Sequence, residues 1–324
     1  MLSRVADNVY WLARYVERAE NLARLVEVNA SLMLDLPREL APGWQSLITI
    51  TGSQERFDEL GKSTSERDII RFLLAEPDNQ GSMVSALAQA RELARTLREI
   101  LPREVWEHLN GLALYVNERA ADAVDKRTRH GFLRYVILAT QSLTGMLEGI
   151  VSEGPALWFM ALGRNIERAD MTSRIVDVRA LGMLPAQGSA MGPFATIQWM
   201  SVLRSLSGYQ MYRIKTGQRV YPAGVVSYLL ADTDFPRACV CCLRRAQEVL
   251  LRLPNSQALV SRVQQLRDGI AATSFELLDG DAVHQYIDQL QLSLAAIHDD
   301  IRQTYFLAGL AAVHPGAGES QSQA

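Results

Sequence analysis

Arginine and glutamate side chains alternate with apolar ones in residues 14–28, which read RYVERAENLARLVEV. The guanidinium group of arginine makes bidentate, charge-assisted bonds to carboxylates and phosphates and stays charged at any relevant pH. On a helix, at about 100° per residue, five polar side chains fall on one stripe and apolar residues occupy the other side. The stripe consists of Arg14, Glu17, Arg18, Asn21 and Arg24. Its chemistry is ion pairing or the binding of an anion.

A second stretch, RNIERADMTSRIVDV at 164–178, repeats this pattern with seven of fifteen positions identical at a constant offset of 150 residues. The corresponding stripe consists of Arg164, Glu167, Arg168, Met171 and Arg174. A single stripe of this kind is most often a solvated helix face, where each ion pair contributes a few tenths of a kcal/mol. The repetition favours a role beyond solvation.

Two such roles are compatible with the residues. Glu17 and Glu167 could pair with arginines across the junction of two halves and form a partly buried clasp. Alternatively, the arginines could face a cavity and hold an anionic ligand, such as phosphate or a peptide carboxylate. The two roles could coexist, and no catalytic residue is predicted.

The elements that position these stripes are predicted to be helices throughout. Apolar residues recur at helical spacing, and Pro and Gly punctuate the chain between the helices. No stretch alternates convincingly as a strand. We expect an all-α protein of about ten to twelve helices.

A further internal match predicts that the whole unit is duplicated. Residues 72–93 align without a gap to 228–249, with eight of 22 positions identical and an offset of 156. Two matches in the same order at nearly the same offset indicate a repeated unit of about 150 residues. We expect helical halves at 1–150 and 151–313, fused in one body with a pseudo-two-fold relation, and a disordered tail at 314–324.

The composition excludes several classes of protein. The 324 residues are 48% hydrophobic and 21% charged, which is typical of a folded protein. The net charge of −3 gives no indication of nucleic acid as a partner. No apolar run approaches the roughly 18 to 20 residues needed to cross a bilayer, and no signal peptide is apparent. We therefore expect no membrane association and a cytoplasmic location.

Other groups of reactive residues point to structure rather than chemistry. Cys239 and Cys242 form a C-x-x-C pair without a second half, so core packing is predicted. Asp281, His284 and Asp288 share a helix face, but the second copy that a bundle metal site needs is missing. No nucleotide-binding or hydrolase motif occurs. No metal and no cofactor are expected.

The chain resembles the bacterial alpha-E family over about residues 1–310. The resemblance is carried by VYWLARYVERAENLARLVEV near the N-terminus, its echo MALGRNIERADMTSRIVDVR, and ARELARTLREILPREVWEHLN at 90–110. Members of that family are predicted to be helical and are named for an E-R motif. Their genes commonly lie beside, or are fused to, those of circularly permuted ATP-grasp proteins, often with a transglutaminase-like or proteasome-like hydrolase nearby.

This resemblance implies a partner more than a reaction. The first hypothesis is a helical partner of an ATP-grasp-type peptide ligase, which scaffolds the ligase or presents its substrate. The alternative is an enzyme that transfers or rearranges an activated acyl or peptide group in the pocket lined by the arginines and glutamates.

Overall fold

The computed structural model describes residues 1–37, 39, 43–183 and 194–307, and these are all-helical, without a strand. They contain fourteen α-helices, of which α2 and α3 have only six residues each. The all-α prediction is therefore confirmed. The predicted disordered tail at 314–324 lies outside the described residues.

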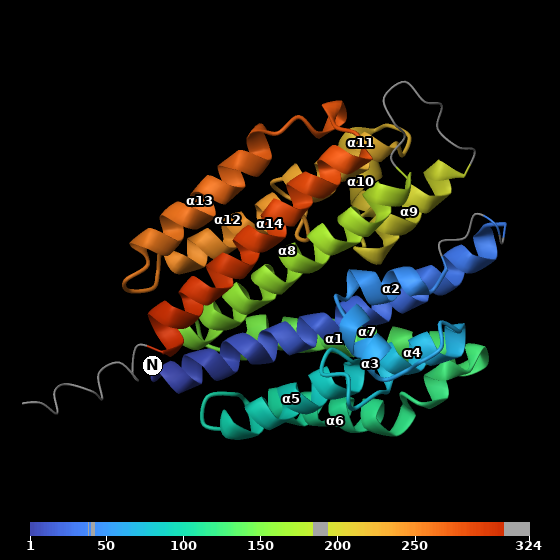
Figure 1. The fold of residues 1–324 in the computed structure, drawn as a ribbon. Helices are drawn as coiled ribbons and strands as arrows, with labels where there is room; N and C mark the ends of the chain where they lie inside the picture. Colours follow the sequence, from blue (N-terminus) through green and yellow to red (C-terminus); the bar gives the residue numbers. More distant parts are fainter. Residues whose placement is uncertain (38, 40–42, 184–193, 308–324) are drawn as a thin grey trace, which may run out of the picture.

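The first half of the chain forms the lower bundle in Figure 1 around the long helix α1. Its elements are α1 (Ser3–Asp35), α2 (Gln45–Ile50), α3 (Gln54–Glu59), α4 (Glu66–Leu74), α5 (Met83–Thr96), α6 (Arg103–Arg119), the 3₁₀ turn η1 (Asp122–Val124) and α7 (Lys126–Ile150).

The second half forms the upper bundle around the equally central helix α8, which runs beside α1 (Figure 1). Its elements are α8 (Pro155–Met183), α9 (Ala195–Ser205), α10 (Tyr209–Thr216), α11 (Pro222–Ala231), α12 (Cys239–Leu250), α13 (Gln257–Ala272), the 3₁₀ turn η2 (Phe275–Leu277), α14 (Gly280–Ile301) and the π-helical turn η3 (Arg302–Phe306).

Short polar residues begin several of these helices. Ser65, Ser82, Asp125 and Asp279 each accept a hydrogen bond from a backbone N–H in the first turn of α4, α5, α7 and α14, respectively. Such caps satisfy one of the N–H groups that a helix leaves without an internal partner. The chain therefore marks these helix starts locally, before any tertiary contact forms.

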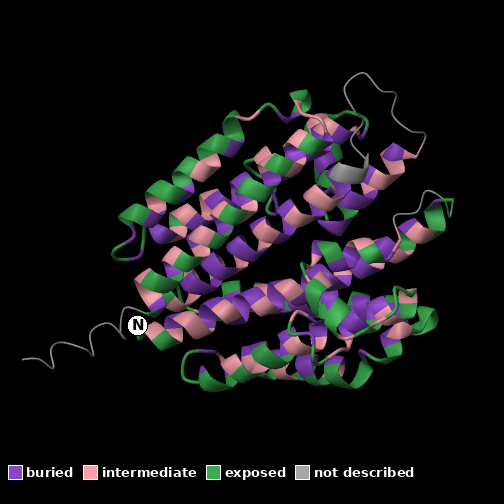
Figure 2. Cartoon of the chain, in the orientation of Figure 1, coloured by how far each residue is buried: buried purple, intermediate pink, exposed green. Residues whose placement is uncertain are grey.

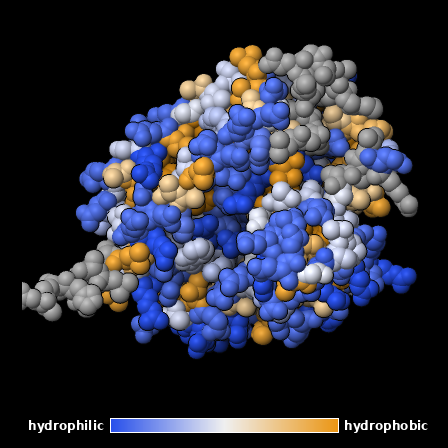
Figure 3. Space-filling model, viewed as in Figure 1, coloured by the Kyte–Doolittle hydropathy of each residue, from blue (hydrophilic) through white to orange (hydrophobic). Residues whose placement is uncertain are grey.

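The buried residues of α1 and α8 lie on the faces that pack against neighbouring helices. One continuous cluster of buried apolar residues extends from Ala6 to Phe306 through both halves. Buried positions line the interior of both bundles, whereas exposed positions lie on their outer faces (Figure 2). The surface seen in Figure 3 is mainly hydrophilic, with small separate apolar areas. No helix among the described residues is long and apolar enough to span a membrane.

The two segments matched in the sequence are both loop–helix units. The first ends in α5, which packs on α1, and the second ends in α12, which packs on α8. These parallels support the duplication and its pseudo-two-fold relation, which stay predictions.

Candidate functional site

Helices α1 and α8 lie in parallel, so that the two arginine–glutamate stripes face each other. Contacts between them follow the same order along both helices, from Arg14 with Glu167 to Asn29 with Arg179. Gly163 permits this approach, since a Cβ atom at this position would lie 2.4 Å from the backbone oxygen of Tyr10. The glutamates at the centres of the stripes, Glu17 and Glu167, are consequently enclosed between the halves, whereas Arg18 and Arg174 stay partly exposed.

Glu167 of α8 pairs with two arginines of α1. Its Oε2 atom lies 2.7 Å from Arg14 Nε, and its Oε1 atom lies 2.7 Å from Arg18 Nε. Glu167 is only 2% exposed. Burial alone would raise the pKa of this carboxyl, but the charges of Arg18 and Arg14 outweigh it and lower the pKa to about 2. Glu167 is therefore ionised at neutral pH.

Glu17 of α1 is held in the reciprocal way by arginines of the second half. Its Oε2 atom lies 3.0 Å from Arg168 Nε, in an arrangement that makes an ion pair but not a hydrogen bond. Its Oε1 atom accepts a hydrogen bond of 2.6 Å from Arg237 Nη1. Burial opposes ionisation, yet Arg237 and Arg168 lower the pKa of Glu17 below its usual value. Each of the two carboxylates thus forms ion pairs with two guanidinium groups.

Arg237 extends this network to a second carboxylate of α1. Its Nη1 atom also donates to Asn21 Oδ1 at 2.7 Å, and its Nη2 atom donates to Glu20 Oε1 at 2.8 Å. Glu20 in turn pairs with Arg24 on the same helix at 2.9 Å. One arginine from the segment before α12 therefore binds three side chains of α1.

Tyr10 and His298 complete the network beside Arg14. The Nδ1 atom of His298 lies 3.2 Å from Arg14 Nη1 and 2.9 Å from the Tyr10 hydroxyl oxygen. Because a guanidinium can only donate, Nδ1 must be the acceptor, and the imidazole is neutral with its proton on Nε2. Burial and the charge of Arg14 accordingly lower the pKa of His298 to about 4.

The structure brings together most, but not all, of the predicted site residues. Arg14, Glu17, Arg18, Asn21, Glu167 and Arg168 meet in the network, with Arg24 at its margin. Arg164 instead pairs with Glu148 of α7 at 2.6 Å, and Arg174 pairs with Asp170 of its own helix at 3.0 Å. Whether the network acts as a clasp or as an anion site stays a prediction.

Sequence reasoning missed Arg237, Tyr10 and His298. Arg237 aligns with Gly81 in the internal match, so the repeat carries no signal for it. Arg237 lies 220 residues from Glu17 and His298 lies 284 residues from Arg14, so only the packing of the helices brings them together.

The cysteines lie in the core, as predicted. All three are free and fully buried. Burial raises the pKa of the Cys242 thiol to about 12 and that of the Cys239 thiol well above its usual value. Thiols held protonated in this way are poor nucleophiles and poor metal ligands.

His284 has a partner that the sequence did not indicate. Its Nδ1 atom lies 2.6 Å from Asp177 Oδ1 of α8, and its Nε2 atom lies 3.6 Å from Asp288 Oδ2. The hydrogen bond to Asp177 raises the pKa of His284. Asp177, His284 and Asp288 each offer one ligand atom, and these three atoms lie within 4.8 Å of one another. Asp177 belongs to α8 and the other two residues belong to α14, so this partly exposed group bridges two helices.

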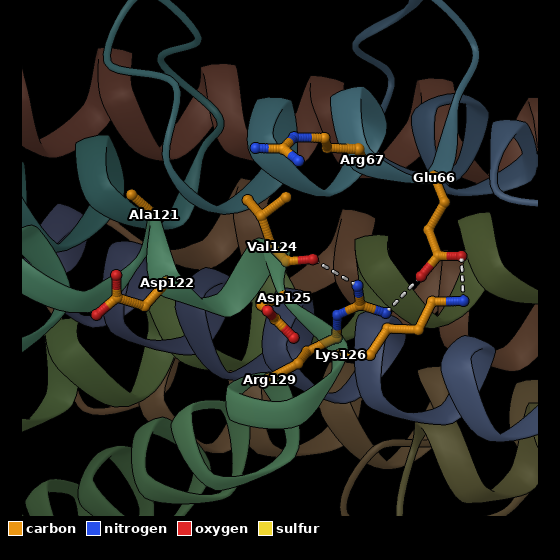
Figure 4. A pocket seen from close by; sticks show the side chains of 8 residues that line it. All are labelled: Glu66, Arg67, Ala121, Asp122, Val124, Asp125, Lys126 and Arg129. Carbon is orange, nitrogen blue, oxygen red and sulfur yellow. Dashed lines mark hydrogen bonds and ion pairs between the residues drawn. The ribbon is translucent and has the colours of Figure 1, made fainter.

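A shallow cavity of about 460 Å³ lies between α4, η1 and the start of α7 (Figure 4). Arg129 lines this cavity, but the guanidinium of Arg129 already donates to the backbone oxygens of Ala123 and Val124 and to Glu66. Lys126 pairs with the same carboxylate at 3.1 Å. These bonds fix the turn before α7, and no buried charge here is left for a ligand.

The fold and site define a class of protein: all-helical, with two bundles joined through a buried arginine–carboxylate network. The chain belongs to the Alpha-E family, which is described as a predicted alpha-helical domain with a conserved ER motif and whose model matches residues 1–306. Glu-Arg pairs stand at the centre of the network, at residues 17–18 and 167–168.

Three mycobacterial proteins resemble the chain over most of its length. Uncharacterized proteins of Mycobacterium bovis and of one Mycobacterium tuberculosis strain are 25% identical over 92% of this chain, and one from a second strain is 24% identical. The chain spans only 36% of the length of each relative. No solved structure matches it.

Proposed function

We propose that the protein is a helical partner of an ATP-grasp-type peptide ligase, and that it scaffolds the ligase or presents its substrate. The observation that carries this proposal is the length of the relatives. Their matched region corresponds to this chain, and nearly two thirds of each relative lies outside the match. The sequence outside the match lies next to the matched unit in each relative, and this supports a role for the unit in binding a further domain or protein.

The chemistry of the network supports a binding role more than a catalytic one. Glu17 and Glu167 are each only 2% exposed, and both are engaged by two arginines. A general acid or base needs a pKa near the working pH and access to the reacting group. The low pKa of Glu167 and its enclosure do not meet these requirements. We therefore place acyl transfer in this network second.

Co-purification with a candidate ATP-grasp protein tests the proposal. The tagged chain is expressed together with that candidate, and in the control a helical protein of similar size and charge replaces the chain. We expect a complex on size-exclusion chromatography, and a change in the rate or product of the ligase when the chain is added. Absence of both effects would overturn the proposal. Turnover of activated acyl or peptide substrates by the pure chain alone would favour the enzyme instead.

A further inference from the structure

A second cavity of about 440 Å³ lies between the end of α7, the first turns of α8, and α12 with the turn that follows it. Its volume falls in the range of about 300–1,000 Å³ that is usual for ligand sites. Val151, Leu157 and Val249 give the wall an apolar part, and Trp158 adds an aromatic ring. The cavity is distinct from the network, although Arg164 lines it.

The charges of this cavity leave one arginine available. Each glutamate in the wall is already neutralised: Glu148 by Arg164, Glu153 by Arg252 and Glu248 by Arg244. Arg245 also lines the cavity, and it has no ion-pair partner among the described residues. An anionic group entering here therefore meets a free guanidinium, with no unpaired carboxylate to repel it.

Three buried polar atoms of the wall have no hydrogen-bond partner. Asn165 is only 3% exposed, and its Nδ2 atom donates to the backbone oxygen of Ala161 at 2.7 Å, which leaves Oδ1 without a donor. The donors Trp158 Nε1 and Arg164 Nε are also unpartnered. Such buried groups are rare in folded proteins and call for an explanation. Here all three belong to residues of α8 that line one cavity.

We propose that this cavity binds the carboxyl-terminal end of a peptide. The terminal carboxylate pairs with Arg245, and a peptide carbonyl accepts from Trp158 Nε1 or Arg164 Nε. A peptide N–H donates to Asn165 Oδ1, and an apolar terminal side chain packs against Leu157. A phosphate or a simple carboxylate offers acceptors only and would leave Asn165 Oδ1 unpaired.

Binding requires a local side-chain adjustment. The three unpartnered atoms lie within the wall rather than at its surface. The half-buried Trp158, over whose ring Arg252 lies at 5.8 Å, is the side chain placed to rotate and admit the peptide. Rotamer changes of this kind are common when partners bind.

Calorimetry with N-acetyl-Ala-Leu and its C-terminal amide tests the proposal on the full chain. We expect the free acid to bind at least about tenfold more tightly than the amide, because only the acid offers a carboxylate to Arg245. Arg245→Gln should remove this preference. Asn165→Leu should weaken both ligands by about fivefold, since one neutral hydrogen bond is lost. The matched control is Arg134→Gln, an exposed arginine of α7 outside the cavity, which should leave both affinities unchanged.

Several outcomes would overturn the peptide site: no binding of the acid, equal binding of acid and amide, or an unchanged preference in Arg245→Gln. Arg245 is partly exposed, so its replacement should leave the melting curve as it is, and loss of binding can then be assigned to the site. The test needs no ligase. Failure here leaves the proposed partnership intact, and failure of co-purification leaves this site intact.

Discussion

At the scale of single residues, two buried carboxylates form ion pairs across the contact between the halves. Glu17 and Glu167 are nearly inaccessible to water, and removal of one partner of a buried pair leaves an uncompensated charge. We therefore expect mutation of these residues to lower stability more than mutation of exposed ion pairs.

Glu17→Gln keeps the shape of the side chain but removes its charge, so Arg168 and Arg237 lose their counter-ion. We expect a loss of about 3 kcal/mol in the free energy of unfolding, measured by urea denaturation, and a similar loss for Glu167→Gln. The control is Glu59→Gln, whose pair with Arg56 is about half exposed on both sides. It should change stability by less than about 0.5 kcal/mol. Equal urea denaturation curves for all three variants would exclude the clasp.

His298 gives the network a dependence on pH. Its pKa is about 4 in the folded protein and near its ordinary value of 6.5 in the unfolded chain. As the pH falls below 6.5, His298 becomes protonated in the unfolded chain but stays neutral in the folded protein. The free energy of unfolding therefore declines until about pH 4. Because the imidazole is partly exposed, we expect a loss of about 1–2 kcal/mol from this residue.

Urea melts of wild type and His298→Asn at pH 7 and pH 4.5 check this expectation. Asn retains an acceptor near the position of Nδ1 but does not titrate, so the variant should lose less stability between the two pH values. Parallel declines would assign the pH dependence to other groups. The low pKa of Glu167 adds a separate decline as the pH falls from about 4.5 to 2.

At the scale of elements, the approach of α1 to α8 depends on Gly163. A methyl group there would meet backbone atoms of Tyr10, which cannot rotate away. We expect Gly163→Ala to lower the free energy of unfolding by about 1–3 kcal/mol. Gly145→Ala in α7 is the matched control, because nothing lies within 4 Å of its added Cβ. This change should instead stabilise the helix by about 0.5–1 kcal/mol. If both substitutions changed the free energy of unfolding in the same direction, the steric explanation would be wrong.

The helices and their polar faces could be predicted from sequence because they depend on local periodicity. The stripe on 14–24 and its copy on 164–174 are visible within three turns of helix. Arg237 lies just outside a helix, and its role depends on how α12 packs against α8, which lies beside α1. The diversion of Arg164 to Glu148 likewise follows from the position of α7. Partners that are far apart in the chain produce no periodic pattern in the sequence, so they could not be predicted from it.

At the scale of the whole molecule, we expect the buried network to make the stability of each half depend on the other. Arg237 joins the second half to three side chains of α1, and the apolar core is continuous. We expect backbone amides of α1 and α12 to lose protection from hydrogen exchange at the same urea concentration. Arg237→Gln should shift both transitions together to lower urea. If one half exchanges while the other stays protected, the halves are separate folding units.

The reciprocal pairing also restricts how the sequence can change over time. Glu17 depends on Arg168, and Glu167 depends on Arg18, so a mutation in either helix leaves a charge stranded in the other. An acceptable replacement would have to alter both helices at once, which is far rarer than a single change. Asn21 accepts a hydrogen bond from Arg237, whereas the equivalent Met171 is a buried apolar side chain, so this position differs between the helices without stranding a charge. We therefore expect these glutamates and arginines to be retained together in both helices.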